Sequence, residues 1–320
     1  MNVAEQKKEN NEQKVLSKFA EAAFIEQRRS RRWGIFFKTL TFSYLFLLLI
    51  IFYRGADPAA EASGEFSALI SMNGIISDQM EINANDVKAS LKNAYANPGT
   101  KAIIMAINSP GGSPVQSGMI NDEIKKYKSL RPEIPVYAVV EDICASGAYY
   151  IAVAADEIFV DKASIVGSIG VRLDQFGFDR AIANLDIDRR LITAGKDKAM
   201  LDPFLPLNPN HKKHLEELLA EVHQQFITVV KQGRAGKLSL NDDVFSGLFW
   251  NGERAIHLGL ADRLGNVDFV AKEVVGFEDI VDFTTYESFA DRFAKKLGAG
   301  IGFAFEATLI KLLTNNYYLN

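Results

Sequence analysis

The hydrophobic and polar positions of this chain form one long apolar run near the start and, from residue 66 onward, a series of short alternating segments. Runs of apolar and β-branched residues predict strands, and apolar residues at a period of 3.6 predict helices. The predicted strands are 68–76, 102–107, 136–140 and 157–160, and the predicted helices between them are 83–96, 115–127 and 146–154. This alternation predicts an α/β fold of βα units, with stacked parallel strands and helices outside.

A longer helix is predicted from 209 to about 233. Apolar residues recur along it at helical spacing, namely Leu215, Leu218, Leu219, Val222 and Phe226. They indicate a core face or a contact with another copy, not a cofactor site.

The early apolar run predicts a membrane anchor. Residues 34–53 are apolar apart from Lys38 and a few hydroxyls, which is close to the about 20 residues that cross a bilayer. Four arginines precede the run, at positions 28, 29, 31 and 32, and only Arg54 follows it. The positive-inside rule then predicts a cytoplasmic leader and an extracytoplasmic main domain. A cleaved signal peptide is the competing interpretation, although the polar leader is long for one.

The composition of the chain argues against several classes of function. The 320 residues are 48% hydrophobic with a net charge of −4, enough apolar material for a sizeable core and no basic excess that would indicate nucleic acid. The single cysteine, Cys144, cannot form an intrachain disulfide, and catalysis by it is a minor alternative. No metal-ligand spacing or phosphate-binding loop is apparent, so we expect neither metal nor cofactor.

Ser146 is the first candidate for chemistry. It stands between Ala145 and Gly147 where a predicted strand passes into a predicted helix. A serine there faces free N–H groups and the positive end of a helix dipole, which favour a developing oxyanion. The structural alternative is an ordinary N-cap, which carries about equal weight on the local sequence.

A second element supports the nucleophile. The apolar strand ending at Asn108 runs into Ser-Pro-Gly-Gly, and Gly111 and Gly112 can present N–H groups without a side chain in the way. An ordinary Pro-Gly turn is the alternative. Ser113 is a weaker nucleophile candidate, because Pro114 restricts its backbone.

The base is less evident. A serine needs a group that takes its proton, and none of the four histidines is marked as a partner. The segment from Leu191 begins as a predicted strand and carries Lys196 and Lys198 before a Pro. A lysine can serve only as the neutral amine, which burial favours, and on local sequence alone surface lysines are the more ordinary interpretation.

Together these segments resemble the signal peptide peptidase A family, membrane-bound serine peptidases of the S49 class. The resemblance spans roughly residues 66–284 and rests on five ordered motifs, which are Asn108-Ser-Pro-Gly-Gly, Ala145-Ser-Gly-Ala-Tyr-Tyr-Ile-Ala, Val166-Gly-Ser-Ile-Gly-Val, Gly195-Lys-Asp-Lys-Ala-Met-Leu-Asp-Pro-Phe and the run from Trp250 to Gly265. Each motif alone is weak.

The resemblance implies a Ser–Lys dyad. Ser146 would be the nucleophile, Lys198 the general base, and Ser168 the residue that orients the lysine amine. Oxyanion donors would be the N–H of Gly147 and of one of the pair Gly111 and Gly112. The fold would be the ClpP/crotonase-like spiral.

The chain has one copy of the motif set, whereas longer relatives carry two, so the resemblance implies a homo-oligomeric ring. For this short form we expect Ser146 from one protomer and Lys198 from its neighbour. The implied substrates are signal peptide remnants or other short apolar peptides, and the implied location is the bacterial cytoplasmic membrane, with the catalytic domain on the periplasmic side.

The expected parts of the chain are a basic leader (1–33), a transmembrane anchor (34–53), a linker (54–65), the peptidase domain (66–284) and a C-terminal tail (285–320). Three alternatives stay open. They are a related protease that acts on membrane-microdomain proteins, a crotonase-like acyl-CoA enzyme and a non-catalytic membrane scaffold.

Overall fold

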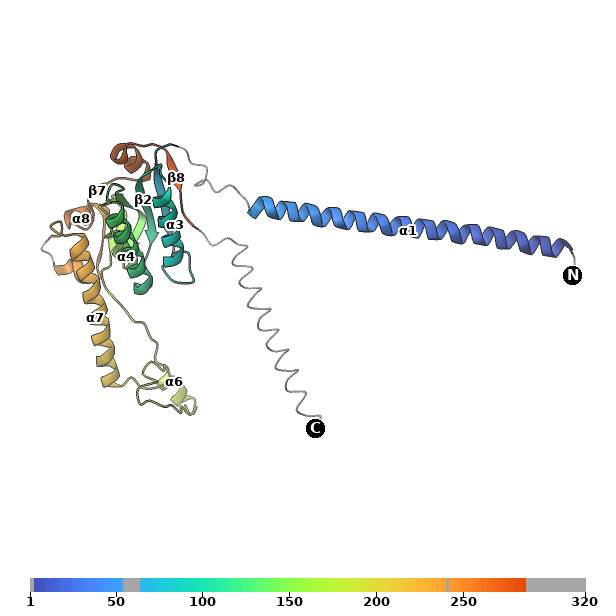
Figure 1. Cartoon of the computed structure of the whole chain (residues 1–320). Coiled ribbons are helices and arrows are strands. Elements are labelled where there is room, and N and C mark those ends of the chain that lie inside the picture. The colour runs from blue at the N-terminus through green and yellow to red at the C-terminus, as the bar shows by residue number, and fades with distance from the viewer. Residues whose placement is uncertain (1–2, 54–63, 240–241, 286–320) are drawn as a thin grey trace. The chain divides into compact units, whose positions relative to one another are not determined.

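A computed structural model describes residues 3–53, 64–239 and 242–285 (Figure 1). It divides into two units, residues 1–60 and 61–320. The expected linker and C-terminal tail lie almost wholly outside the described residues.

The first unit contains one helix, α1 (Val3–Tyr53). Within Phe24–Ile50 a window of 18 residues reaches a mean hydropathy of 1.7, so the helix is long and apolar enough to cross a membrane by length and composition. This stretch overlaps the expected anchor at 34–53.

The second unit is built on one sheet. Its strands are β1 (Phe66–Asn73), β2 (Thr100–Ser109), β3 (Val136–Ala145), β4 (Glu157–Val160), β5 (Ile165–Gly167), β6 (Phe249–Asn251), β7 (Arg263–Leu264) and β8 (Ile280–Asp282). The order along the sheet is β6-β5-β3-β2-β1-β8, with β4 beside β3 and β7 beside β4. Every pairing is parallel except β5 with β6, which confirms the predicted α/β class.

The helices of this unit are α3 (Ala84–Ala96), α4 (Pro114–Leu130), α5 (Gly147–Ala152), α6 (Asp179–Asn184), α7 (Pro209–Gly233), α8 (Gly252–His257) and α9 (Val267–Phe269), with a 3₁₀ turn η1 (Asp242–Phe245) and a π-helical turn η2 (Val270–Val275). The predicted helices at 83–96 and 209–233 agree closely with α3 and α7. Asparagine caps begin both helices, Asn83 for α3 and Asn208 for α7.

β3 changes partner halfway along, and this bend positions the site. Its first half pairs with β4 and its second half, Ile143–Ala145, pairs with β5. Against β2, the register steps from Ile107↔Val140 to Ser109↔Cys144, so β3 bulges between these pairs. A bulge bends and twists a strand. The strand therefore extends five residues beyond its predicted end and turns from one strand neighbour to the next.

The core lies under the first half of β3. Ile104, Val139 and Phe159 form a buried cluster with Val270 and Ala271 of η2. Burial of such side chains provides the main driving force for folding.

One part of the second unit has no core. Residues 171–225 include no buried residue, and Figure 1 shows α6 beside the outer end of α7, away from the sheet. We call these residues the arm. The strand predicted to begin at Leu191 is absent, since the described residues 187–193 have no regular structure. Only Phe226 and Val230 of α7 are buried, so the core interpretation was wrong for the helix's first half.

Candidate active site

Ser146 lies at the strand-to-helix junction that the sequence predicts, between the last residue of β3 and the first of α5. Its φ of 53° and ψ of −121° match the first central position of a type II′ turn, which glycine usually occupies. Its side chain makes no capping hydrogen bond to α5, so the N-cap alternative does not account for the hydroxyl. The residue is partly exposed, and a backbone held in this sparsely populated conformation is common at active sites.

The glycine-rich loop after β2 packs directly against this turn. A Cβ built on Gly111 would lie 2.9 Å from the Cβ of Ser146 and 2.8 Å from the backbone nitrogen of Gly147. A Cβ on Gly147 would lie 2.5 Å from the Ser117 hydroxyl and 3.3 Å from the nitrogen of Gly112. Such close approach of two backbones requires glycine on both sides.

Hydrogen bonds distinguish the three glycines. The N–H of Gly111 donates to the Ser109 hydroxyl over 3.2 Å. Within the described residues, the N–H groups of Gly112 and Gly147 have no such acceptor. Gly112 is exposed and Gly147 begins α5, so these two free donors lie near each other beside Ser146.

Ser168 is linked to Ser146 through the backbone. The Ser146 N–H donates to the carbonyl of Gly167 over 2.9 Å, and the Ser168 N–H donates to Leu248 over 2.7 Å. Ser168 also has a positive φ, 54°. The structure thus holds both serines in strained conformations at the ends of the short β3–β5 ladder.

Lys198 does not reach Ser146 within one chain. It is exposed in the arm, and its neighbour Asp197 contacts His211 at the outer end of α7 over 2.9 Å. The inner end of α7 packs near the serine, where the ring of Phe226 lies 5.2 Å from that of Tyr150. The 15 residues from His211 to Phe226 span about 22 Å of helix, so Lys198, next to Asp197, lies near the opposite end of α7 from the Phe226–Tyr150 contact.

The other sequence candidates have structural roles. The Ser113 side chain accepts from the Gln116 N–H and caps α4, so it is engaged away from any substrate. Cys144 is fully buried, and burial raises the pKa of its thiol well above the ordinary value, which disfavours the reactive thiolate. The described residues contain no cluster of His, Cys, Asp and Glu side chains able to hold a metal ion.

Sequence reasoning missed one contact beside the site. A ring nitrogen of His223, on α7, lies 3.0 Å from the carbonyl oxygen of Ile169, the residue after Ser168. The sequence marks none of the histidines as a partner of the serine, and no local signal connects His223 with a loop 54 residues earlier.

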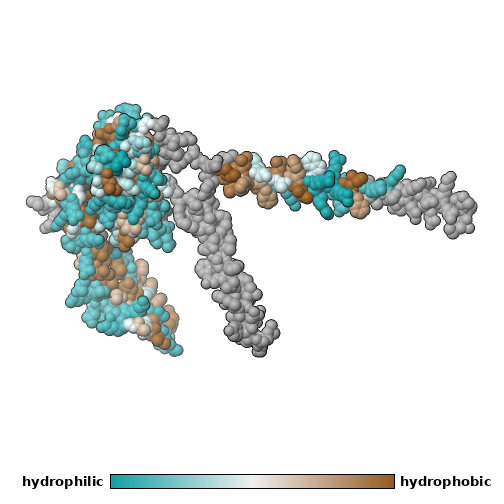
Figure 2. Space-filling view, in the orientation of Figure 1, coloured by the Kyte–Doolittle hydropathy of each residue, from teal (hydrophilic) through white to brown (hydrophobic). Residues whose placement is uncertain are grey.

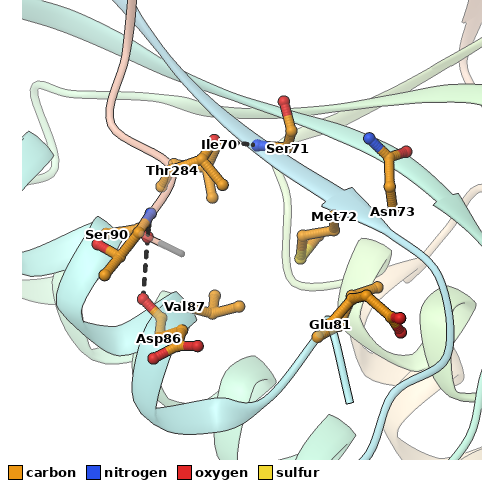
Figure 3. A pocket seen from close by; sticks show the side chains of 11 residues that line it. Ile70, Ser71, Met72, Asn73, Glu81, Asp86, Val87, Ser90 and Thr284 are labelled. Carbon is orange, nitrogen blue, oxygen red and sulfur yellow. Dashed lines mark hydrogen bonds between the residues drawn. The ribbon is translucent and has the colours of Figure 1, made fainter. Parts of the chain in front are cut away.

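A small pocket lies elsewhere, between β1, α3 and the residues after β8 (Figure 3). The Thr284 hydroxyl accepts there from the Ser71 N–H over 2.8 Å. The pocket has a volume of about 20 Å³, which has room for one water and no larger ligand.

Comparison with known proteins shows a similarity to one peptidase family. A profile of peptidase family S49 matches residues 128–276, which include Ser146, Ser168 and Lys198. Over these residues the chain is similar to S49 peptidases. A candidate signal peptide peptidase of Enterococcus faecium is 26% identical over 250 residues, covering 74% of this chain and 72% of that relative.

A Na⁺/H⁺ antiporter NhaA of Brucella abortus is 45% identical over 186 residues, or 58% of this chain. The chain spans only 25% of that relative's length. Among solved structures, a ClpP1 mutant of Listeria monocytogenes is 14% identical, with a TM-score of 0.40, over 62% of this chain and 91% of the ClpP1 chain.

Proposed function

We propose that this chain is a membrane-anchored serine endopeptidase of the S49 type that cleaves short apolar peptides, such as signal peptide remnants, with Ser146 as nucleophile. The observation that carries the proposal is the strained turn at Ser146 packed against Gly111 and Gly112. An S49 domain over the same residues supports it.

The oxyanion would be bound by the N–H groups of Gly112 and Gly147. Both donors are free, whereas the N–H of Gly111 is engaged by Ser109. Preorganised N–H donors typically lower the barrier of acyl transfer by about 3–4 kcal/mol each. The role of Gly111 is then steric, since any side chain there would collide with the Ser146 turn.

The base would be Lys198 of a neighbouring protomer. Its distance from Ser146 within one chain supports this assignment, because a base must lie within hydrogen-bond reach of the hydroxyl it deprotonates. Ser168, adjacent to the Gly167 carbonyl that holds Ser146, would orient the incoming amine.

The arm supplies a reason for assembly. Large apolar side chains are exposed along it, namely Leu173, Phe176, Phe178, Leu185, Ile187, Leu191, Ile192, Leu201, Phe204, Leu207 and Leu218. Ile192 is 97% exposed, and Figure 2 shows hydrophobic surface toward the outer end of α7. Exposed apolar surface of this extent is typical of a protein interface, which supports a homo-oligomeric ring.

The anchor would be the apolar run at residues 34–53 of α1, most of which lies within the stretch Phe24–Ile50, with the arginine-rich leader before it in the cytoplasm and the catalytic domain outside, at a bacterial cytoplasmic membrane. No cofactor and no nucleic acid takes part.

The test is activity of the full-length protein purified in detergent. It should react with a fluorophosphonate probe at Ser146, identified by mass spectrometry, and cleave members of an apolar peptide library. A protein that hydrolyses an acyl-CoA thioester and no peptide, or that reacts with neither substrate nor probe, would refute the proposal.

A further inference from the structure

A wide groove lies over the middle of β3, where that strand bends, and at the carboxyl end of β4, beside β7 and α9, with a volume of about 930 Å³. Its floor is apolar and is formed by Val139, Val140, Val160, Leu264, Val267 and Phe269. Its rim carries four carboxylates and one ammonium, from Glu141, Asp142, Asp161, Asp268 and Lys162. Ligands of open α/β sheets commonly bind at this end of the strands.

The rim keeps an excess of negative charge, four carboxylates against the one ammonium of Lys162. Asp142 accepts a hydrogen bond from the Asn108 amide over 3.1 Å, and Asp161 accepts one from the Ala163 N–H over 2.9 Å. In the described part of the chain none of the four carboxylates forms an ion pair, and all four residues are exposed. A cationic group would therefore meet several unpaired carboxylates above an apolar floor.

The groove lies close to Ser146. Ile165 lines the groove and begins β5, whose last residue, Gly167, accepts the hydrogen bond of the Ser146 N–H. Ile165 and Gly167 are two residues apart on an extended strand, about 7 Å at 3.3 Å per residue. A peptide held at Ser146 would reach the groove within about three or four extended residues.

We propose that this groove binds the cationic end of the peptide substrate and so selects apolar peptides that carry lysine or arginine a few residues from the cleaved bond. The inference rests on the proposed function. Lysine and arginine stems pack on apolar surface while their charged ends reach carboxylates, which matches this floor and rim.

Charge complementarity favours this occupant over the arm of another copy. The arm's loop region, 171–208, has six aspartates and six lysines or arginines, so it carries no net charge to match the rim.

The experiment measures binding to the full-length S146A protein, which should hold peptides without cutting them. Two fluorescent peptides share one apolar segment, and one ends in three lysines while the other ends in three glutamines. The lysine peptide should bind about tenfold more tightly at low salt, and high salt should reduce this preference because exposed charges are screened. The double variant E141Q/D268N should lose most of the preference, and the control E221Q, on the exposed face of α7, should retain it.

Equal binding of the two peptides, or a lysine preference unchanged in E141Q/D268N, would overturn the proposal. A photoreactive p-benzoylphenylalanine in place of Phe269 then identifies the occupant. Adducts of the lysine peptide support the proposal, whereas adducts only with another copy or with residues 286–320 overturn it. Because these measurements need no turnover, a protein that binds the lysine peptide without cleaving any peptide would refute the proposed function alone.

Discussion

The backbone N–H of Ser146 donates a hydrogen bond to the carbonyl oxygen of Gly167 over 2.9 Å, which connects the proposed nucleophile to the residue before Ser168. Both serines have positive φ, 53° and 54°, where non-glycine residues cost of order 1–3 kcal/mol each. The surrounding β3–β5 pairing holds both in place. Backbone strain at both serines fits an active site in which the hydroxyls of Ser146 and Ser168 must each keep a fixed direction.

Removing the Ser146 hydroxyl should abolish peptide cleavage. Ser146→Ala deletes the attacking oxygen and little volume, so turnover should fall at least about 10³-fold while the oligomer persists. Cleavage of a fluorogenic peptide and size-exclusion chromatography check both points.

Ser113→Ala is the matched control, because Ser113 caps α4. That variant should lose about 1 kcal/mol of stability and keep most of its activity. Near-normal turnover of Ser146→Ala would require a different nucleophile.

Mixed oligomers test whether Ser146 and Lys198 come from different protomers. Ser146→Ala and Lys198→Ala should each be inactive, but co-expression should restore activity, since some interfaces then combine an intact serine with an intact lysine. Random mixing predicts recovery of about one quarter, for interfaces that pair one protomer with the next. Copurification through two affinity tags confirms mixing.

Controls at the lysines sharpen that test. Lys198→Arg should be inactive, because a guanidinium stays protonated and cannot accept the serine proton. Lys196→Ala should be mild, since its side chain is 92% exposed. Mixed oligomers without activity, from two inactive parents, would place both residues in one protomer. The reverse pattern, an inactive Lys196→Ala with an active Lys198→Ala, would move the base to Lys196.

His223 should act as a positioning residue for the loop that carries Ser168. Its ring nitrogen contacts the Ile169 carbonyl over 3.0 Å. His223→Ala should lower kcat about tenfold with little change in KM, because a loosened Ser168 aligns the base less well. His223→Gln, whose amide can donate to the same carbonyl, should recover much of the loss. A merely structural role would show no such recovery, and the control His214→Ala should have no effect.

The orientation of the chain can be tested by proteolysis. Protease added outside intact spheroplasts should digest or release the domain beyond Arg54 and spare residues 1–33, because the arginine cluster holds the leader inside. Antibodies against each part detect the fragments. Protection of the large domain would reverse the orientation.

The sequence predicted those features of the fold that depend on residues close together in the chain. Apolar runs gave the positions of β1, β2 and β4, and helical spacing gave those of α3 and α7, because these elements depend on nearby residues. The same reasoning placed Ser146 at its junction.

What the local pattern could not give depends on contacts distant in sequence. The bulge in β3 is set by pairing with both β2 and β5, so the predicted strand ended too early at Val140. Leu215 and Leu219 of α7 have core spacing but no core beneath them in this chain. Their apolar periodicity indicates burial without saying whether the partner is the same chain or another copy.

The ion pair of Arg234 and Asp262 should make stability depend on acid pH. Arg234 ends α7 with its side chain only 2% exposed, and it bonds Asp262, 13% exposed, over 2.6 Å. Burial alone would raise the pKa of the Asp262 carboxyl, but hydrogen bonds from Arg234, Lys237 and the Ile158 N–H outweigh burial and hold it below its ordinary value. A carboxyl with a lowered folded pKa stabilises the fold fully above its unfolded pKa of about 3.9, and this contribution is lost as pH falls through the folded pKa.

Asp262→Asn should therefore lower the free energy of unfolding at pH 7 by about 3–5 kcal/mol, because it leaves a buried guanidinium without its carboxylate. The difference from the parent protein should shrink as pH falls below about 4, where the parent loses the same charge. Urea unfolding followed by tryptophan fluorescence measures both effects. Glu157→Gln is the control, since it breaks the exposed pair with Arg263 and should cost only about 0–1 kcal/mol. A difference between Asp262→Asn and the parent that stays constant from pH 7 to acid would mean that packing, and not the carboxylate charge, gives Asp262 its role.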